Sequence, residues 1–316
     1  MGKRLAPALI IAAGCMWGTV GLFVRYLSDA GLDAMSIVEA RLFGAFIITF
    51  IGLLIYDRRL LRVKRKDLWC FVGSGVASGI FLNFFYSTAI EMVSLALAAT
   101  LLSTAPVFVI ILSALLFRER ITPAKLRSLA LAFCGCALAS GLFDGIGAFS
   151  LPGLAVGLAS GLGYALYSVF SRLAINRGYS SLTINIYSFL FASVGCCFFA
   201  DFGRIGGLLA ASPLPFGSFL LLHAVIASVA PYMLYTFGMK YVDTGRASIL
   251  VSCEPVAATL FGVIAYREIP SLLTAAGVAL VLLALVLLNL PPRPPAGKQA
   301  PSIGNRPPDA ALPPDR

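Results

Sequence analysis

Charged residues and histidine are scarce in this chain. Only 12% of its 316 residues are Asp, Glu, Lys or Arg, and it holds one histidine. A typical soluble domain carries about 25% charged residues, whereas 59% of this sequence is hydrophobic. The shortage of charge excludes an ordinary soluble protein and indicates a chain that lies in a membrane.

The motifs of several protein classes are also missing. The sequence has no H-E-x-x-H, no G-x-S-x-G and no G-x-x-x-x-G-K-[ST], which argues against an intramembrane hydrolase or an ATP-driven pump. It has no acidic pair suited to metal chemistry and no ring of charges typical of a channel. The seven cysteines lie in apolar runs, which favours packing over metal binding or disulfides. We therefore expect no metal site, no cofactor and no enzymatic activity.

The hydrophobic residues gather in ten long runs. A helix needs about 20 apolar residues to cross a bilayer, and helices satisfy their backbone polar groups internally. We therefore predict an all-α integral membrane protein with ten transmembrane helices, of which 126–143 is the shortest. The runs are 6–27, 35–55, 68–90, 95–117, 126–143, 152–173, 182–200, 217–239, 247–266 and 271–290.

The basic residues are unequally divided between the loops that ten spans create. The side that holds the N-terminus has twenty Lys and Arg residues, whereas the other side has only Arg25, Arg204 and Arg267. Basic loop residues concentrate on the cytoplasmic side, so this placement explains the net charge without nucleic-acid binding. We expect both termini in the cytoplasm and an even number of spans. Residues 291–316 contain nine prolines and are predicted to be a disordered tail.

Two stretches of the chain repeat one pattern. Residues 96–119 and 245–268 align without a gap, and a proline, Pro106 or Pro255, interrupts each apolar run near its middle. Such segments at matching places in two halves indicate a transporter's binding site, where the bends take part in gating. A passive kink is the alternative for each proline. Each proline also frees the carbonyl four residues earlier, and the nearby Ser103 and Ser252 could replace the lost hydrogen bond.

Each half of the chain holds five predicted helices, over 6–143 and 152–290. Because five is odd, the second half enters the membrane from the opposite side, so the halves are expected to be inverted repeats. We expect the repeats to enclose a central cavity with an apolar wall and a few polar groups. The candidate substrate-binding residues on the aligned spans are Trp17 and Tyr164, Asn83 and Tyr232, Tyr86 and Tyr235, and Ser103 and Ser252.

Glycines four residues apart occur on three of the predicted spans. Small residues at this spacing let helix backbones approach closely. We therefore expect the first, third and sixth spans to be crowded together at the centre of the bundle. The glycines are Gly14 and Gly18, Gly75 and Gly79, and Gly153, Gly157 and Gly161.

Four ionisable residues lie within predicted spans, where such side chains are functional hypotheses by default. Glu254 is the deepest, and it could carry a proton, pair with a substrate amine, or form a buried structural hydrogen bond. His223 is the second candidate for proton coupling, although a lone histidine is more often a packing residue. Arg41 is interpreted as a structural residue, with carboxylate binding as the alternative, and Glu39 is expected at the membrane interface.

Two glutamates close the broken helices. Glu119 and Glu268 occupy equivalent positions at opposite membrane faces, and we interpret both as structural residues. Thr122 and Ser271 follow three residues later, where their hydroxyls are expected to cap the next helices.

These residues resemble those of the drug/metabolite transporter superfamily, in its ten-helix EamA-domain family. The resemblance covers residues 6–290, and two inverted copies of the pattern carry it. The matching positions are Trp17-Gly18, Arg41, Pro106 through Glu119, and Glu254-Pro255 through Glu268. It implies a transporter in the bacterial inner membrane, usually an exporter of amino acids or other small metabolites, with a cavity lined by spans 1, 3, 4, 6, 8 and 9.

We therefore predict a secondary transporter that works by alternating access. Aromatic side chains around one buried acid suit a zwitterion or an amine, so the expected substrates are small metabolites such as amino acids. A lipid flippase of the same architecture is the alternative, and an intramembrane enzyme fits less well. The expected partners are the substrate and the lipid bilayer, with a homodimer left open.

Overall fold

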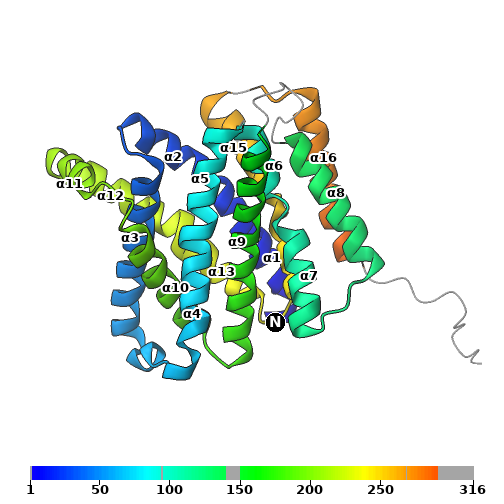
Figure 1. Cartoon of the computed structure of the whole chain (residues 1–316), viewed down its shortest axis with the longest axis horizontal. Coiled ribbons are helices and arrows are strands. Elements are labelled where there is room, and N and C mark those ends of the chain that lie inside the picture. Colours follow the sequence, from blue (N-terminus) through cyan, green and yellow to red (C-terminus); the bar gives the residue numbers. More distant parts are fainter. Residues whose placement is uncertain (1, 94, 140–149, 268, 291–316) are drawn as a thin grey trace, which may run out of the picture.

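The chain forms a single bundle of helices (Figure 1). The computed structural model describes residues 2–93, 95–139, 150–267 and 269–290, and the regular structure within these ranges is entirely helical. The first half contains α1 (Gly2–Gly18), α2 (Val20–Asp29), α3 (Ala34–Tyr56), η1 (Arg58–Leu61), η2 (Arg65–Asp67), α4 (Leu68–Val76), η3 (Ala77–Leu82), α5 (Asn83–Met92), α6 (Leu95–Leu102), α7 (Ala105–Phe117) and α8 (Pro123–Ala139). The second half contains α9 (Leu151–Asn176), α10 (Ser181–Cys196), α11 (Phe202–Ala211), α12 (Pro213–Ala224), η4 (Val225–Val229), α13 (Ala230–Gly238), α14 (Thr244–Leu250), η5 (Val251–Cys253), α15 (Glu254–Tyr266) and α16 (Leu272–Asn289).

Several of these elements join end to end into longer apolar stretches. Within the described residues, eight stretches are long and apolar enough to cross a membrane. They are Arg4–Asp29, Ala34–Tyr56, Arg65–Met92, Leu97–Phe117, Leu151–Asn176, Pro213–Gly238, Thr244–Tyr266 and Leu272–Asn289.

The remaining two predicted spans are shorter helices. The run 126–143 corresponds to α8, which has 17 residues, and residues 140–143 lie outside the described part of the chain. The run 182–200 corresponds to α10, which has 16 residues. The chain turns after α10 because the side chain of Asp201 caps α11, a helix that the sequence analysis did not predict. The tail 291–316 also lies outside the described residues.

Side-chain caps fix where several helices begin. The backbone N–H of Lys125 donates to Oγ1 of Thr122 at 3.2 Å, and the N–H of Thr274 donates to Oγ of Ser271 at 3.1 Å. Each cap satisfies a backbone donor that the first turn of a helix leaves without a partner. Both predicted caps are thereby confirmed.

The two halves of the chain interlock. In the described residues, α1 packs against α13 and α15 of the second half, and α9 packs against α4, α5 and α7 of the first half. α3 packs against α10 in the same way. α8 packs against α16, and Figure 1 shows this pair at one edge of the bundle. The first helix of each half, α1 or α9, is therefore surrounded mainly by helices of the other half.

The beginning of α1 and the end of α16 both lie near the loop of residues 239–243. A Cβ on Gly238, at the end of α13, would lie 2.5 Å from Ile10, so the start of α1 is next to this loop. Asn289, at the end of α16, accepts a hydrogen bond of 2.8 Å from Arg246 in the first turn of α14. The beginning of α1 and the end of α16 are thus at the same end of the bundle.

Candidate functional site

Both proline-containing stretches are broken, as the sequence predicted. α6 ends at Leu102 and α7 begins at Ala105, with Pro106 in the first turn of α7. In the second half, the 3₁₀ turn η5 separates α14 from α15, and Pro255 lies in the first turn of α15. The first turn is where a missing N–H costs no helical hydrogen bond. The two prolines therefore mark new helix starts in the middle of a membrane-length stretch.

The serines beside the breaks bond to different carbonyls from those expected. Oγ of Ser103 donates to the carbonyl of Ala99 at 2.9 Å, and Oγ of Ser252 donates to the carbonyl of Ser248 at 3.3 Å. Each hydroxyl bonds one full turn back along its own helix, as serine commonly does in membrane helices. The expectation that they would serve the carbonyls four residues before the prolines was wrong.

A glycine of the opposite half packs against each break. A Cβ on Gly14 of α1 would lie 2.5 Å from Sγ of Cys253 and 2.9 Å from the carbonyl oxygen of Val251. A Cβ on Gly161 of α9 would lie 2.7 Å from Oγ1 of Thr104. The two glycines align in the repeat, and their missing side chains let α1 and α9 lie directly against the interrupted helices.

The two breaks meet at a cavity of about 270 Å³. Six of the nine candidate substrate-binding residues line it, and both prolines lie in its wall. The six are Tyr86, Ser103, Tyr164, Tyr235, Ser252 and Glu254, beside Pro106 and Pro255. A concave site with a mainly apolar wall and a few polar groups is suited to a small organic ligand.

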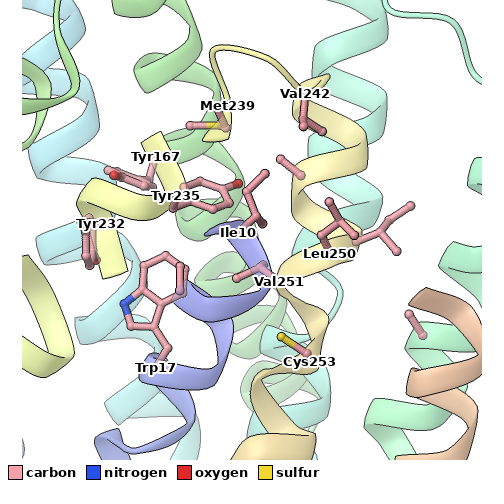
Figure 2. Close-up of a cluster of buried hydrophobic side chains, with 14 of the residues drawn as sticks. Ile10, Trp17, Tyr167, Tyr232, Tyr235, Met239, Val242, Leu250, Val251 and Cys253 are labelled. Carbon is pink, nitrogen blue, oxygen red and sulfur yellow. The ribbon is translucent and has the colours of Figure 1, made fainter. Parts of the chain in front are cut away.

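Trp17 and Tyr232 form a second layer behind this wall. The Trp17 ring lies 5.2 Å from the ring of Tyr232, 5.6 Å from Tyr235 and 6.1 Å from Tyr164, measured between centroids. Figure 2 shows Trp17 of α1 next to Tyr232 and Tyr235 of α13. Edge-to-face packing of this kind fixes the orientation of aromatic rings. Trp17 therefore positions two of the tyrosines that face the cavity.

Among the described residues that line this cavity, Glu254 is the only Asp, Glu, Lys, Arg or His. It is the first residue of α15, and no residue in the described part of the chain forms a hydrogen bond to its carboxylate. The hydroxyl of Tyr164, also in the wall, is buried without a hydrogen-bond partner in the same ranges. The cavity thus presents one carboxylate and one phenol that a ligand could satisfy.

The remaining ionisable candidates lie outside the cavity wall. His223 is fully buried and stacks on Phe23 at 4.9 Å, with neither ring nitrogen hydrogen-bonded within the described ranges. Arg41 is also buried, with 8% of its surface exposed. The polar candidate Asn83 also lies outside the wall, and its side chain donates to the carbonyl of Gly79 at 3.2 Å. Glu39 is buried within the protein, and Oγ of Ser193 donates to its carboxylate at 2.6 Å.

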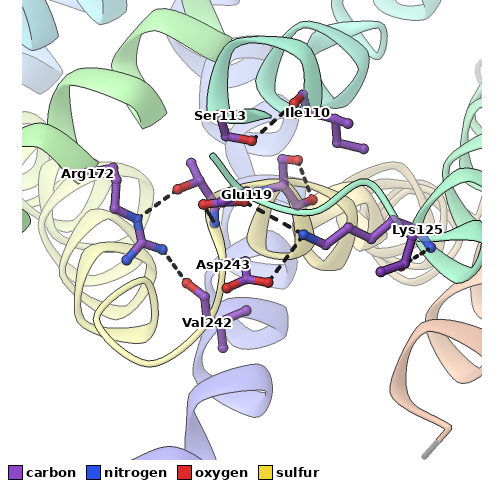
Figure 3. Close-up of polar contacts among 11 residues, drawn as sticks. Ile110, Ser113, Glu119, Lys125, Arg172, Val242 and Asp243 are labelled. Carbon is purple, nitrogen blue, oxygen red and sulfur yellow. Dashed lines mark hydrogen bonds and ion pairs between the residues drawn. The ribbon is translucent and has the colours of Figure 1, made fainter. Parts of the chain in front are cut away.

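A polar network fastens the break-containing helices to their neighbours at one end (Figure 3). The two oxygens of Glu119 accept from the backbone N–H groups of Thr244 at 2.8 Å and of Gly245 at 3.1 Å, which caps α14. Lys125 lies 3.7 Å from Glu119 and 3.2 Å from Asp243. Glu119 therefore holds a structural position between the halves, whereas Glu268 lies outside the described residues.

Nearby, Arg172 of α9 binds the segment that leads into α14. Its Nε donates to Oγ1 of Thr244 at 2.7 Å, and its Nη2 donates to the carbonyl of Val242. Arg172 and Glu119 thus hold Thr244 from two sides. At this end of the bundle, α7, α9 and α14 are in contact with one another.

Replacing Glu119 with glutamine is expected to lower the stability of the folded protein by about 1 kcal/mol, the usual size of a lost helix cap. The amide keeps one acceptor, but it places an NH₂ group against backbone donors and removes the charge opposite Lys125. Thermal unfolding in detergent measures the change. Glu91→Gln, at an exposed carboxylate, is the matched control and should change stability by less than about 0.5 kcal/mol. Equal melting of both variants would contradict the capping role.

Four polar or sulfur-containing lining residues were not predicted from the sequence, although three of them could have been. Ser168, Ser248 and Thr259 line the cavity, and each lies four residues from a candidate or a proline, on the same helix face. Cys136 also lines the cavity, and it comes from α8, on a span that was not expected to contribute.

The third span of each half contains a π-helical turn that no sequence signal predicted. These turns are η3 (Ala77–Leu82) and η4 (Val225–Val229), at nearly equivalent positions of the two halves. π-Helical turns are rare and occur frequently at functional sites. Here they directly precede the helices that carry Tyr86 and Tyr235 to the cavity.

Membrane-length helices around a cavity with a mainly apolar wall define a multi-pass membrane protein. Comparison with known families gives its family: the model of the EamA-like transporter family matches residues 4–141 and 151–290. The chain belongs to this family, within the drug/metabolite transporter superfamily. The predicted resemblance is confirmed, and the two matches divide the chain where its halves meet.

Relatives from distant organisms share nearly the full length. An uncharacterized transporter of Archaeoglobus fulgidus is 32% identical over 286 residues, covering 90% of this chain and 96% of the relative. The uncharacterized transporter YxxF of Bacillus subtilis is 23% identical and covers 90% of this chain and 89% of its own. One crystal structure superposes with a TM-score of 0.74 at 20% identity, covering 90% of this chain and 96% of that one, which shows the same fold.

Proposed function

We propose that this protein is a secondary transporter that exports small metabolites such as amino acids by alternating access. The substrate binds in the cavity between the two helix breaks. The single observation that carries the proposal is that a cavity lies where α6–α7 and α14–α15 are both interrupted, with Glu254 in its wall. Half-helices that meet at the middle of a membrane form the substrate sites of many secondary transporters.

In this proposal the chain crosses the inner membrane of a bacterium ten times, as two inverted five-helix repeats over 6–143 and 152–290. The reciprocal packing of α1 and α9 supports the inversion, because Gly14 contacts the second break and Gly161 contacts the first. The count of ten requires the shorter helices α8 and α10 to span as well. An even number of spans agrees with the structure, because the beginning of α1 and the end of α16 lie at the same end of the bundle. The charge distribution assigns this end to the cytoplasm.

The chemistry of the cavity wall supports a substrate with an amino group. Glu254 can pair with an ammonium ion, and Tyr86, Tyr164 and Tyr235 offer aromatic surface to a cation or an apolar side chain. Glu254 is also the proposed proton-coupling residue, because a carboxyl group in such a site can exchange a proton for the substrate. His223 is less suited to this role since it lies outside the cavity wall.

Alternating access requires the closed end of the bundle to open. In the present conformation, Arg172 and Glu119 hold the start of α14, and in the cavity wall Oγ of Ser168 lies 2.9 Å from the hydroxyl of Tyr235. We propose that these contacts break when the cavity opens toward the cytoplasm. The bends at Pro106 and Pro255 are the positions where the broken helices change direction.

Transport by purified protein in liposomes tests the proposal. Vesicles are loaded with a panel of labelled amino acids, amines and other metabolites, with and without a pH gradient, and a fluorescent phospholipid in the same vesicles reports flippase activity. Release of at least one small metabolite that requires the protein supports transport. Lipid scrambling without release of any metabolite would overturn the assignment.

Filling the cavity is expected to block transport without unfolding the protein. Ser103→Phe places a ring in the cavity and should lower the initial rate for every substrate at least tenfold, because the site buries most of a small ligand. Leu116→Phe, on the exposed face of α7, introduces the same ring outside the cavity and should transport normally. Both variants are compared by initial rate and by thermal unfolding. A fully active Ser103→Phe protein of normal stability would exclude this cavity as the site.

A further inference from the structure

The loop between α3 and α4 concentrates positive charge on the bundle's surface. Within residues 58–66, six of nine side chains are basic, and all six are exposed. The loop lies at the end of the bundle that the charge distribution assigns to the cytoplasm, toward the lower edge of Figure 1. The six residues, here called the basic loop, are Arg58, Arg59, Arg62, Lys64, Arg65 and Lys66.

The two acids that flank the basic loop are already engaged. The side chain of Asp57 accepts from the backbone N–H of Arg59 at 2.9 Å and so caps η1. Asp67 is buried, forms an ion pair of 3.1 Å with Arg177, and accepts from the hydroxyl of Tyr179 at 2.7 Å. In the described part of the chain, neither carboxylate forms an ion pair with a cation of the basic loop. The positive charge of the loop is therefore not neutralised by its own neighbours.

The basic loop is held in a fixed shape by the opposite half of the chain. Oγ1 of Thr183 donates to the carbonyl of Leu60 at 2.9 Å, and the hydroxyl of Tyr187 donates to the carbonyl of Leu61 at 2.6 Å. The N–H of Lys64 donates to the hydroxyl of Tyr179 at 3.2 Å. Burial and the bond to Asp67 raise the pKa of Tyr179, so this hydroxyl keeps its proton. The cations are thus presented from a preformed surface, which lowers the entropy lost on binding.

Two exposed aromatic residues place the loop relative to the bilayer. Tyr56 is 78% exposed at the end of α3, and Trp69 is 47% exposed at the start of α4, where the guanidinium of Arg177 stacks on it at 4.8 Å. Tyrosine and tryptophan with this exposure gather at the level of the lipid headgroups. Since the basic loop directly joins these two residues, its side chains reach the phosphate layer.

We propose that the basic loop is a binding surface for the headgroups of anionic phospholipids in the leaflet that it faces. A fixed group of arginines and lysines next to a membrane helix attracts anionic headgroups by about 1 kcal/mol per side chain, or about fivefold in affinity. Arginine also binds phosphate oxygens in a two-pronged geometry. This surface is separate from the transport cavity, so its lipid binding does not depend on the transport proposal.

Native mass spectrometry of the full-length protein tests the proposal. The protein is extracted from vesicles that contain equal amounts of phosphatidylglycerol and phosphatidylcholine, and the ratio of the two bound lipids is measured. The variant R59Q/R62Q/R65Q removes three charges from the basic loop. The matched control, R118Q/R120Q/R127Q, removes three exposed arginines from the loop and helix after α7, at the same end of the bundle.

We expect the unmodified protein and the control to favour phosphatidylglycerol. In the basic-loop variant, the ratio of bound phosphatidylglycerol to bound phosphatidylcholine should fall at least tenfold, while the melting temperature in detergent stays unchanged. Equal losses in the two variants would show nonspecific attraction by net charge and overturn the proposal. An unchanged lipid ratio in the basic-loop variant would also overturn it. If the Gln variant unfolds, R59K/R62K/R65K keeps the charge and must retain the lipid preference.

Discussion

Glu254→Gln is expected to lower the rate of transport at least tenfold while the protein still inserts and folds. Glutamine has nearly the same shape as glutamate, but it cannot offer a negative charge to a substrate amine and cannot carry a proton. A hydrogen bond to a charged group contributes about 1.5–3 kcal/mol, which corresponds to at least a tenfold change in affinity. Initial rates in liposomes, with a substrate found in the metabolite panel, measure the effect.

The second half of this experiment separates the two roles of the carboxylate. If Glu254 only carries the proton, exchange of labelled for unlabelled substrate continues in the glutamine variant although transport driven by a pH gradient stops. If Glu254 binds the substrate, exchange is lost as well. Glu91→Gln, at an exposed carboxylate on α5, controls for the loss of one charge and should transport normally. Full activity of the Glu254→Gln protein in both assays would remove Glu254 from the site.

Gly14→Ala and Gly161→Ala are each expected to destabilise the protein by about 1–3 kcal/mol, the usual effect of adding an atom to a packed interior. The new methyl group would lie 2.5 Å from Sγ of Cys253 in the first case and 2.7 Å from Oγ1 of Thr104 in the second. The neighbours at both places include backbone atoms of the helix breaks, so α1 or α9 must move away from the cavity. Transport should therefore fall along with thermal stability.

Gly52→Ala is the matched control for these two substitutions. Gly52 lies in α3, and no atom of the described residues is found within 4 Å of a Cβ placed on it. Alanine is favoured over glycine inside a helix by about 0.5–1 kcal/mol, so this variant should be slightly more stable. A decrease in stability at Gly52 equal to that at Gly14 or Gly161 would show that helix geometry, rather than contact with the breaks, causes the effect.

The helices and their interruptions could be predicted from the sequence because local rules decide them. Long apolar runs require helices in lipid, and proline in the middle of such a run favours a break, as at Pro106 and Pro255. The glycines marked places where helices approach closely, and the third and sixth spans do pack together. The first span, however, packs mainly against α13 and α15, so that part of the prediction was wrong. The end of α10 and the helix α11 were missed because Asp201 acts through a cap that hydropathy does not reveal.

The cavity could be predicted only in part because its wall depends on how helices rotate against one another. Tyr164 and Tyr235 were found through the repeat, and Glu254 was found as an ionisable residue within a predicted span; all three line the cavity. Trp17 satisfied the same pattern but packs behind these tyrosines. Cys136 could not be anticipated, because repeat symmetry gives no information on how far the fifth span leans toward the centre.

The interlocking of the halves has a consequence for biosynthesis. The partners of α1 are α13 and α15, which the ribosome produces near the end of the chain. α1 therefore enters the membrane long before the surface against which it is buried exists. In the meantime the narrow face at Gly14 is open to lipid or to the insertion machinery. Assembly of the bundle must wait until nearly the whole protein has been translated.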